Sequence, residues 1–178
     1  MKNLNYILVA LLISTFTFAI ETVQVVGSIE IDAPIEEVFE FVADPMNDHI
    51  WRSEVNEMTT NTRHLKEGSI FREDAWIGIR KHFITTTELI KLDYPHQALF
   101  ETVKSNPYFL RSNRLFEETL NGTTFSYVVD FDKRMIKETF GFNAKPEVVV
   151  KLYSLLMKKY LYKLKKSFAN NHKSTHYN

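Results

Sequence analysis

The longest regular pattern in the chain begins at Pro146 and predicts an amphipathic helix, which needs a large apolar surface to pack on. Its apolar residues recur at intervals of three and four, at Val149, Leu152, Tyr153, Leu156, Tyr160, Leu164 and Phe168. Such a helix owes most of its stability to the packing of its apolar face. The rest of the chain must therefore supply a matching surface. The sequence after residue 170 is polar, and we expect residues 171–178 to form a disordered tail.

The middle of the chain predicts that this surface is an antiparallel β-sheet, because turns and not helices separate its segments. Turn signals fall at residues 66–69, near Gly78, and at residues 93–96, 105–107 and 121–123. This spacing is typical of a meander of about six strands. The clearest alternation places the following residues on one face of a strand: Phe125, Tyr127, Val129 and Phe131. The other face is mostly polar, so we expect one buried and one solvated side.

The segment before the meander predicts one strand followed by two short helices. Residues 23–31 are rich in β-branched side chains, which favours a strand. Asp32 and Pro34 then form a helix start, with Asp32 at the cap and Pro34 in the first turn. The expected apolar face of this helix consists of Val38, Phe41 and Val42. The second short helix is expected to carry Ile50 and Trp51. The pattern as a whole predicts an α+β chain of about seven strands.

The first 19 residues have the parts of a secretory signal peptide. Lys2 precedes an apolar run, and the small residues Thr17 and Ala19 stand before a cleavage position. We therefore expect export to the periplasm or the exterior, cleavage of residues 1–19, and a folded domain at residues 20–170. The apolar run is also at the short limit for a membrane span. An uncleaved membrane anchor at residues 4–20 is the alternative.

The net charge of the chain is zero, but the charge is unevenly distributed. From Lys145 to the end there are eight lysines and one acidic residue, Glu147, whereas residues 20–144 are net acidic. The simpler interpretation is a solvated helix face beside an acidic body. The alternative is contact with an anionic membrane surface through Lys158, Lys159, Lys163, Lys165 and Lys166. Nucleic acid is not expected as a partner, because the binding motifs are missing.

Several kinds of chemistry are excluded or disfavoured by the residue types. The chain has no cysteine, which excludes disulfides, thiolate metal sites and cysteine nucleophiles. It also lacks phosphate-binding glycine loops, histidine pairs with metal-ligand spacing in a folded context, and the G-x-S-x-G motif. We therefore predict no metal and no cofactor. Acid–base chemistry stays open through charged residues on predicted strands, namely Arg72, Asp74, His82, Glu88, Glu101, Arg111 and Arg114. None can be assigned a catalytic role from the sequence.

Five segments in this order resemble the START-like or Bet v 1-like (SRPBCC) superfamily, and within it the polyketide cyclase/dehydrase and lipid-transport group. They read GSIEIDAPIEEVFEFVADPMNDHIW, EGSIFRED, TTELIKLDYPHQALFE, NGTTFSYVVDFD and LLMKKYLYKLKKSF. The resemblance implies a helix-grip fold, in which a curved antiparallel sheet of about seven strands surrounds a long C-terminal helix. Two short helices would follow the first strand. The resemblance also implies a cavity between the sheet and the long helix.

On that fold, aromatic and apolar side chains are candidates to line the cavity, although ordinary core packing is the alternative for each. The candidates are Trp51, Trp76, Phe125, Tyr127, Phe131, Tyr153, Leu156, Met157 and Tyr160. The leading hypothesis is binding, or transport, of a hydrophobic small molecule such as a lipid, isoprenoid or polyketide. One alternative is an enzyme of the cyclase or dehydratase type. Another is an interaction module for a membrane surface or a protein, with the cavity filled by side chains.

Overall fold

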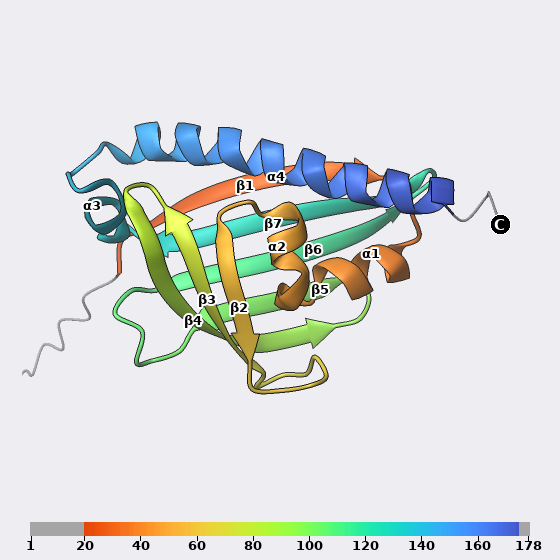
Figure 1. Cartoon of the computed structure of the whole chain (residues 1–178), viewed down its shortest axis with the longest axis horizontal. Coiled ribbons are helices and arrows are strands. Elements are labelled where there is room, and N and C mark those ends of the chain that lie inside the picture. Colours follow the sequence, from red (N-terminus) through yellow and green to blue (C-terminus); the bar gives the residue numbers. More distant parts are fainter. Residues whose placement is uncertain (1–19, 175–178) are drawn as a thin grey trace, which may run out of the picture.

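Seven strands form one antiparallel sheet, and a long C-terminal helix lies along it (Figure 1). The computed structural model describes residues 20–174. The strands are β1 (Thr22–Ile31), β2 (Val55–Thr60), β3 (Ile70–Ile77), β4 (Arg80–Asp93), β5 (Gln97–Thr102), β6 (Leu110–Thr119) and β7 (Gly122–Asp132). Their order across the sheet is β1-β7-β6-β5-β4-β3-β2, with every neighbouring pair antiparallel. The predicted α+β helix-grip fold is therefore confirmed.

The predicted turns fall between strands, and the predicted alternation of β7 holds. Phe125, Tyr127, Val129 and Phe131 are all buried on the inner face of the sheet. Asp132 is an exception on the other face, because its carboxylate is also buried and accepts hydrogen bonds from the Arg134 backbone and side chain. The sheet thus covers one continuous apolar core.

Three short helical segments connect β1 to β2: α1 (Ile35–Val42), η1 (Pro45–Asn47) and α2 (Asp48–Trp51). The prediction that Asp32 caps α1 is wrong, because Pro34 occupies the cap position and no side chain caps the helix. The buried face of α1 also differs from the prediction. It includes Phe39, whereas Phe41 is half-buried against the edge of the Phe168 ring. Trp51 is fully buried, and Ile50 is exposed.

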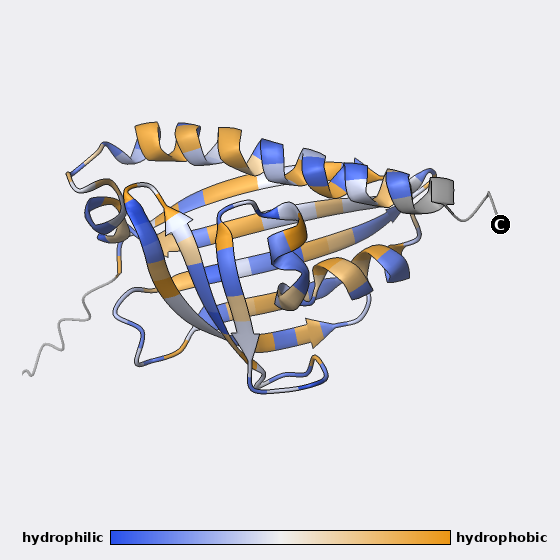
Figure 2. Cartoon of the chain, viewed as in Figure 1, coloured by the Kyte–Doolittle hydropathy of each residue, from blue (hydrophilic) through white to orange (hydrophobic). Residues whose placement is uncertain are grey.

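The helix α4 (Pro146–Ser174) packs on β1 and α2, and so closes the curved sheet (Figure 1). The side chains that it buries are Val149, Met157, Tyr160, Leu161, Leu164 and Phe168. Leu152 and Leu156, which were predicted on this face, are exposed on the outer side. Figure 2 shows the resulting contrast along α4, with an apolar first half and a polar second half. The helix also reaches Ser174, within the segment predicted as a disordered tail.

A further helix, α3 (Met135–Phe140), lies between β7 and α4 and was not predicted. It ends at Gly141, whose φ of 77° is the left-handed conformation that glycine adopts at helix C-termini. The predicted signal peptide or anchor, residues 1–19, lies outside the described residues. Within residues 20–174, no helix is both long enough and apolar enough to cross a membrane.

Candidate functional site

The inner face of the sheet encloses a small cavity together with α2 and α4, and its volume is about 60 Å³. Its polar wall consists of Asp48, Arg52, Glu73, Thr85, Thr87, Ser112 and Arg114. Its apolar wall consists of Pro45, Met58, Ile77, Phe100, Leu110 and Val129, with the rings of Tyr127 and Tyr153. A cavity that combines an apolar wall with converging polar groups is the usual form of a small-molecule site.

Asp48 is the centre of the polar wall. It stands at the start of α2, and its side chain is fully buried. Both of its carboxylate oxygens accept hydrogen bonds from the guanidinium group of Arg114 on β6, at 2.9 and 2.7 Å. Arg52, one helical turn after Asp48, donates to the same carboxylate at 3.0 Å. Arg114 also donates to the carbonyl oxygen of Val42 at the end of α1. The pair therefore ties both helical segments to the sheet.

Arg52 extends this cluster to β3 and to the loop before β2. Its two terminal nitrogens donate to the two oxygens of Glu73, each at 2.8 Å. Its Nε donates to Glu54 at 3.0 Å. Burial acts to lower the pKa of Arg52, but Glu73 and the other acidic neighbours outweigh it and raise that pKa well above its ordinary value. The buried cluster thus contains three carboxylates and two arginines, which gives an excess of one negative charge.

Two polar atoms in the cavity wall have no hydrogen-bond partner among the described residues: Ser112 Oγ and Arg114 Nε. Both residues are almost fully buried on β6, where residues 110, 112, 114 and 116 face inward. Buried polar groups nearly always have a partner. The hydroxyl of Ser112 can donate or accept, and the Nε–H of Arg114 can only donate. Each of the two atoms is therefore free to hydrogen-bond a polar atom of a bound molecule.

Tyrosine hydroxyl groups add further donors near this wall. Tyr127 and Tyr153 both line the cavity. Burial raises the pKa of Tyr153 strongly, so its hydroxyl stays protonated at every physiological pH. Burial, followed by the charge of Glu54, likewise raises the pKa of Tyr160. The Tyr160 hydroxyl and Glu54 Oε2 influence each other electrostatically, but they form no hydrogen bond of ordinary geometry.

Most of the aromatic candidates do not line the cavity. Trp51 and Phe125 lie in the core, where their rings meet edge to face at 6.1 Å. Phe131 packs on the edge of Tyr153. Met157 packs against Gly27 of β1, where an added methyl group would stand 2.6 Å from its sulfur.

Trp76 and Leu156 were expected near the cavity but point to solvent. Trp76 is 55% exposed on the outer face of β3, and its indole nitrogen donates to the carbonyl oxygen of Gly78 at 3.0 Å. Leu156 is 38% exposed on the outer side of α4. On a strand, a shift of one residue moves a side chain to the opposite face, and the poor alternation of β3 left the direction of Trp76 open.

Of the charged strand residues considered for acid–base chemistry, Arg114 points into the cavity. Asp74 and His82 form a hydrogen bond at 2.8 Å on the outer face, and Glu101 and Arg111 form an ion pair there. Arg72 is exposed, and Glu88 is half-buried beside the inward-facing Leu89. The residues predicted from the sequence do not include Asp48, Arg52, Glu54, Glu73 and Ser112. The spacing of four between Asp48 and Arg52 was the available signal, because it puts both on one side of a helical turn.

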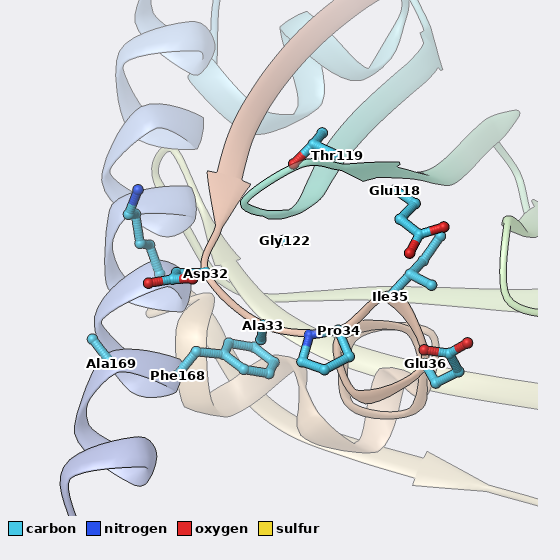
Figure 3. Close-up of a pocket in the computed structure, with 11 residues that line it drawn as sticks. Asp32, Ala33, Pro34, Ile35, Glu36, Glu118, Thr119, Gly122, Phe168 and Ala169 are labelled. Atoms are coloured by element: carbon cyan, nitrogen blue, oxygen red, sulfur yellow. The ribbon is translucent and has the colours of Figure 1, made fainter.

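A larger groove of about 710 Å³ lies on the surface at the far end of the sheet, between α1, the β6–β7 turn and α4 (Figure 3). It is lined by Asp32, Ala33, Pro34, Ile35, Glu36, Glu118, Thr119, Gly122, Lys165, Phe168 and Ala169. None of these residues has an unpaired buried polar atom. In the part of the chain that the structure describes, no cluster of acidic or histidine side chains is placed to hold a metal ion. We therefore take the internal cavity as the candidate site.

Comparison with known proteins agrees with this architecture. A family model described as polyketide cyclase/dehydrase and lipid transport matches residues 22–169. No curated protein has significant sequence similarity to the chain. Among solved structures, the di-domain ARO/CYC BexL from the BE-7585A biosynthetic pathway aligns with a TM-score of 0.59 and 19% identity, over 82% of this chain and 49% of BexL. The di-domain ARO/CYC StfQ from the steffimycin biosynthetic pathway aligns with a TM-score of 0.65 and 12% identity, over 86% of this chain and 52% of StfQ.

A third similar structure is of comparable size to this chain. TTHA0849 from Thermus thermophilus aligns with a TM-score of 0.65 and 16% identity, over 83% of this chain and 98% of TTHA0849. By contrast, the chain spans only about half the length of the two di-domain proteins, BexL and StfQ. At these identities the three likenesses show a shared fold.

Proposed function

The chain belongs to the polyketide cyclase/dehydrase and lipid transport family, and on that premise we propose that it binds an apolar small molecule, such as a lipid, isoprenoid or polyketide, in the cavity beneath α4. The observation that carries this proposal is the position of Ser112 Oγ and Arg114 Nε. Both are buried and unpaired among the described residues, and both belong to residues of the cavity's polar wall, opposite its apolar side chains. They offer a polar anchor for the end of a ligand.

The cavity is too small to hold a whole lipid-sized ligand unless side chains of its wall move. About 60 Å³ holds a few non-hydrogen atoms, so a larger ligand must displace side chains. Met58 and Tyr153 are the wall residues best suited to move, because both are half-buried and one of them is a flexible methionine on the edge strand β2. Burial of apolar ligand surface yields about 25 cal/mol per Å². Burial of roughly 300 Å² would therefore support micromolar binding.

The charge of the polar wall favours a ligand with a neutral polar end. Asp48 and Glu73 already occupy the terminal nitrogens of both arginines. A carboxylate ligand would add a second negative charge to a cluster that already has one in excess, and in a buried site that repulsion is poorly screened. A ketone or hydroxyl oxygen can accept from Arg114 Nε–H without this cost. We therefore infer that the ligand is an apolar alcohol or ketone and not a fatty acid.

A second candidate function is catalysis of the cyclase or dehydratase type. The supporting observation is that donors of three kinds, the Arg114 guanidinium and the Ser112 and Tyr127 hydroxyls, belong to one wall. Such donors can stabilise the negative charge that develops on a carbonyl oxygen when an enolate forms. The carboxylate of Asp48 is a poor base here, because arginine nitrogens occupy both of its oxygens.

Native mass spectrometry of the purified protein tests the binding proposal. We expect a co-purified mass, and we expect displacement of a fluorescent apolar dye by a long-chain alcohol or ketone to be stronger than displacement by the matching carboxylic acid. Ser112→Val and Tyr127→Phe should weaken alcohol binding, while Tyr162→Phe on the exposed side of α4 serves as the matched control. An apo mass together with no dye displacement by any of these compounds would overturn the proposal.

Mass analysis of a ketone incubated with the protein separates binding from catalysis. A polyketide-like ketone incubated with the protein should be recovered unchanged if the chain is a binding protein. Loss of one water from its mass, abolished in Arg114→Met at preserved fold, would instead establish the enzyme. Circular dichroism of each variant reports whether the fold is preserved.

A further inference from the structure

Large apolar side chains gather on the surface at the end of the domain where α3 lies. Trp76, Ile79 and Phe142 are 55%, 66% and 61% exposed. Val148, Leu152 and Leu155, on the first turns of α4, are each about half exposed. Figure 2 shows the same apolar first half of α4, above α3 and the tip of the β3–β4 hairpin. We call these six residues the end patch. Exposed apolar clusters of this kind usually mark an interaction surface.

The backbone holds the hairpin part of the end patch rigidly against α3. The amide of Ile79 donates to the carbonyl oxygen of Thr139 at 2.8 Å. Arg80 Nε donates to the carbonyl oxygen of Glu138 at 3.0 Å. Gly78 allows this approach, because a methyl group there would stand 2.1 Å from the Thr139 oxygen. Ile79 and Phe142 are thus kept exposed side by side, with the Ile79 side chain directly over Gly141.

The part of the end patch on α4 lies on one helix face. Val148, Leu152 and Leu155 are spaced by four and three residues, which aligns them along the outer side of the helix. The inner side is occupied by Val149 and Met157, which are buried. Leu152 and Leu155 therefore lie outside the buried core, with about half of each side chain open to solvent.

Basic side chains surround the end patch. Lys81, Lys137, Lys145 and Lys151 are exposed and form no ion pair among the described residues. The acidic residues nearby are largely occupied: Glu21 pairs with Lys133, Asp132 with Arg134 and Glu138 with Arg80. Glu147 also lies in the first turn of α4. At this end of the domain, cationic side chains therefore outnumber the carboxylates.

We propose that the end patch docks on an anionic lipid bilayer. An apolar cluster ringed by lysines matches a bilayer surface, because the rings and aliphatic groups enter the interface while the ammonium groups meet lipid phosphates. The carboxylate-lined groove of Figure 3 lies at the opposite end of β1, so this orientation keeps it away from the anionic surface.

The course of the chain supports the same partner. Ile20, the first described residue, is 54% exposed and precedes β1 at this end, where Lys133 pairs with Glu21. The apolar residues 1–19 join the domain here. If they are retained as an anchor, they hold this end nearest to the bilayer. If they are removed, the end patch alone supplies the contact. The proposal does not depend on what the cavity binds.

Vesicle flotation of residues 20–178, which contain every described element of the fold, tests this proposal. We expect the protein to float with vesicles of phosphatidylcholine and phosphatidylglycerol at low salt, and to float less at high salt or with pure phosphatidylcholine. Ile79→Ser combined with Phe142→Ser should lower the bound fraction about ten-fold. Lys81→Glu combined with Lys137→Glu should abolish the salt-sensitive component.

Two matched controls locate the surface. Leu120→Ser removes a fully exposed leucine at the opposite end of the domain, and Lys158→Glu with Lys159→Glu reverses charge near the middle of α4. Both should float like the wild type. The proposal is overturned if the wild type does not float, or if only these control variants lose binding. It is also overturned if ultracentrifugation shows a dimer that Ile79→Ser with Phe142→Ser dissociates while vesicle binding is absent.

Discussion

Asp48 of α2 and Arg114 of β6, 66 positions apart in the sequence, form a two-point ion pair closed off from solvent. Their distances are 2.9 Å from Nη1 to Oδ1 and 2.7 Å from Nη2 to Oδ2. The exposed fractions of the two side chains are 0% and 3%. The pair joins the helical segment before β2 to the centre of the sheet. It also shapes the candidate site, because Arg114 lines the cavity and its Nε has no partner among the described residues.

Asp48→Ala should destabilise the protein by about 3–5 kcal/mol, because it leaves Arg114 and part of Arg52 as buried charges without a counter-ion. Urea unfolding followed by tryptophan fluorescence measures the free energy. Glu101→Ala breaks the Glu101–Arg111 pair on the outer face of the sheet and serves as control, with an expected loss of at most about 1 kcal/mol. Equal losses in the two variants would show that the buried pair has no special role.

Gly27→Ala should destabilise the packing of α4 on β1. A methyl group at this position would stand 2.6 Å from the sulfur of Met157, so the helix or the methionine must shift. Overpacking of this kind costs about 1–3 kcal/mol. Thermal unfolding of the single variants, Gly27→Ala and Met157→Ala, and of the double variant measures the coupling. The double variant should lose less stability than the sum of the single losses; simple additivity would contradict the proposed contact.

Ionisation of the Asp132 carboxyl should make the free energy of unfolding depend on pH under acidic conditions. Burial acts to raise its pKa, but hydrogen bonds from Arg134 outweigh burial and lower the pKa below its ordinary value of 3.8. A lowered pKa in the folded state means that the carboxylate stabilises the fold above pH 3.8, and that this contribution disappears as the pH falls through the folded-state pKa.

The difference in Tm between the wild type and Asp132→Asn should therefore be constant above about pH 5 and shrink as the pH falls toward about pH 2, as followed by circular dichroism. Glu117→Gln, which removes an exposed carboxylate on β6, is measured over the same pH range as the control variant. A difference for Asp132→Asn that stays constant over this whole pH range would refute the linkage.

The full-length chain, produced in a Gram-negative bacterium, should be exported and cleaved after Ala19, because residues 1–19 have the charge, hydrophobicity and small residues of a signal peptide. N-terminal sequencing of the periplasmic protein should then begin at Ile20. Recovery of the intact chain in the membrane fraction would favour the alternative, an anchor at residues 4–20. Replacement of Ala19 by Arg should block cleavage, and this variant identifies the uncleaved form on a gel.

The sequence by itself determined the elements of the fold, because their signals are local. Alternation along β7 showed which of its side chains are buried, and periodicity after Pro146 indicated the long helix. The turn residues separated the strands correctly. Helix α3 was missed, because a helix of two turns between a strand and a longer helix leaves only Gly141 as a signal.

Only the tertiary structure decided which residues form the site. Tyr127 and Tyr153 belong to the wall of the small internal cavity, whereas Trp76 faces solvent and Met157 packs over Gly27. Sequence periodicity predicts that a side chain is buried, but it does not reveal what the side chain meets.

The same limit applies more strongly to the charges. Arg114 and Asp48 are buried because each supplies the counter-ion that makes the burial of the other tolerable. That compensation arises between residues far apart in the chain, so it exists only once the sheet has curved and α2 has closed against it.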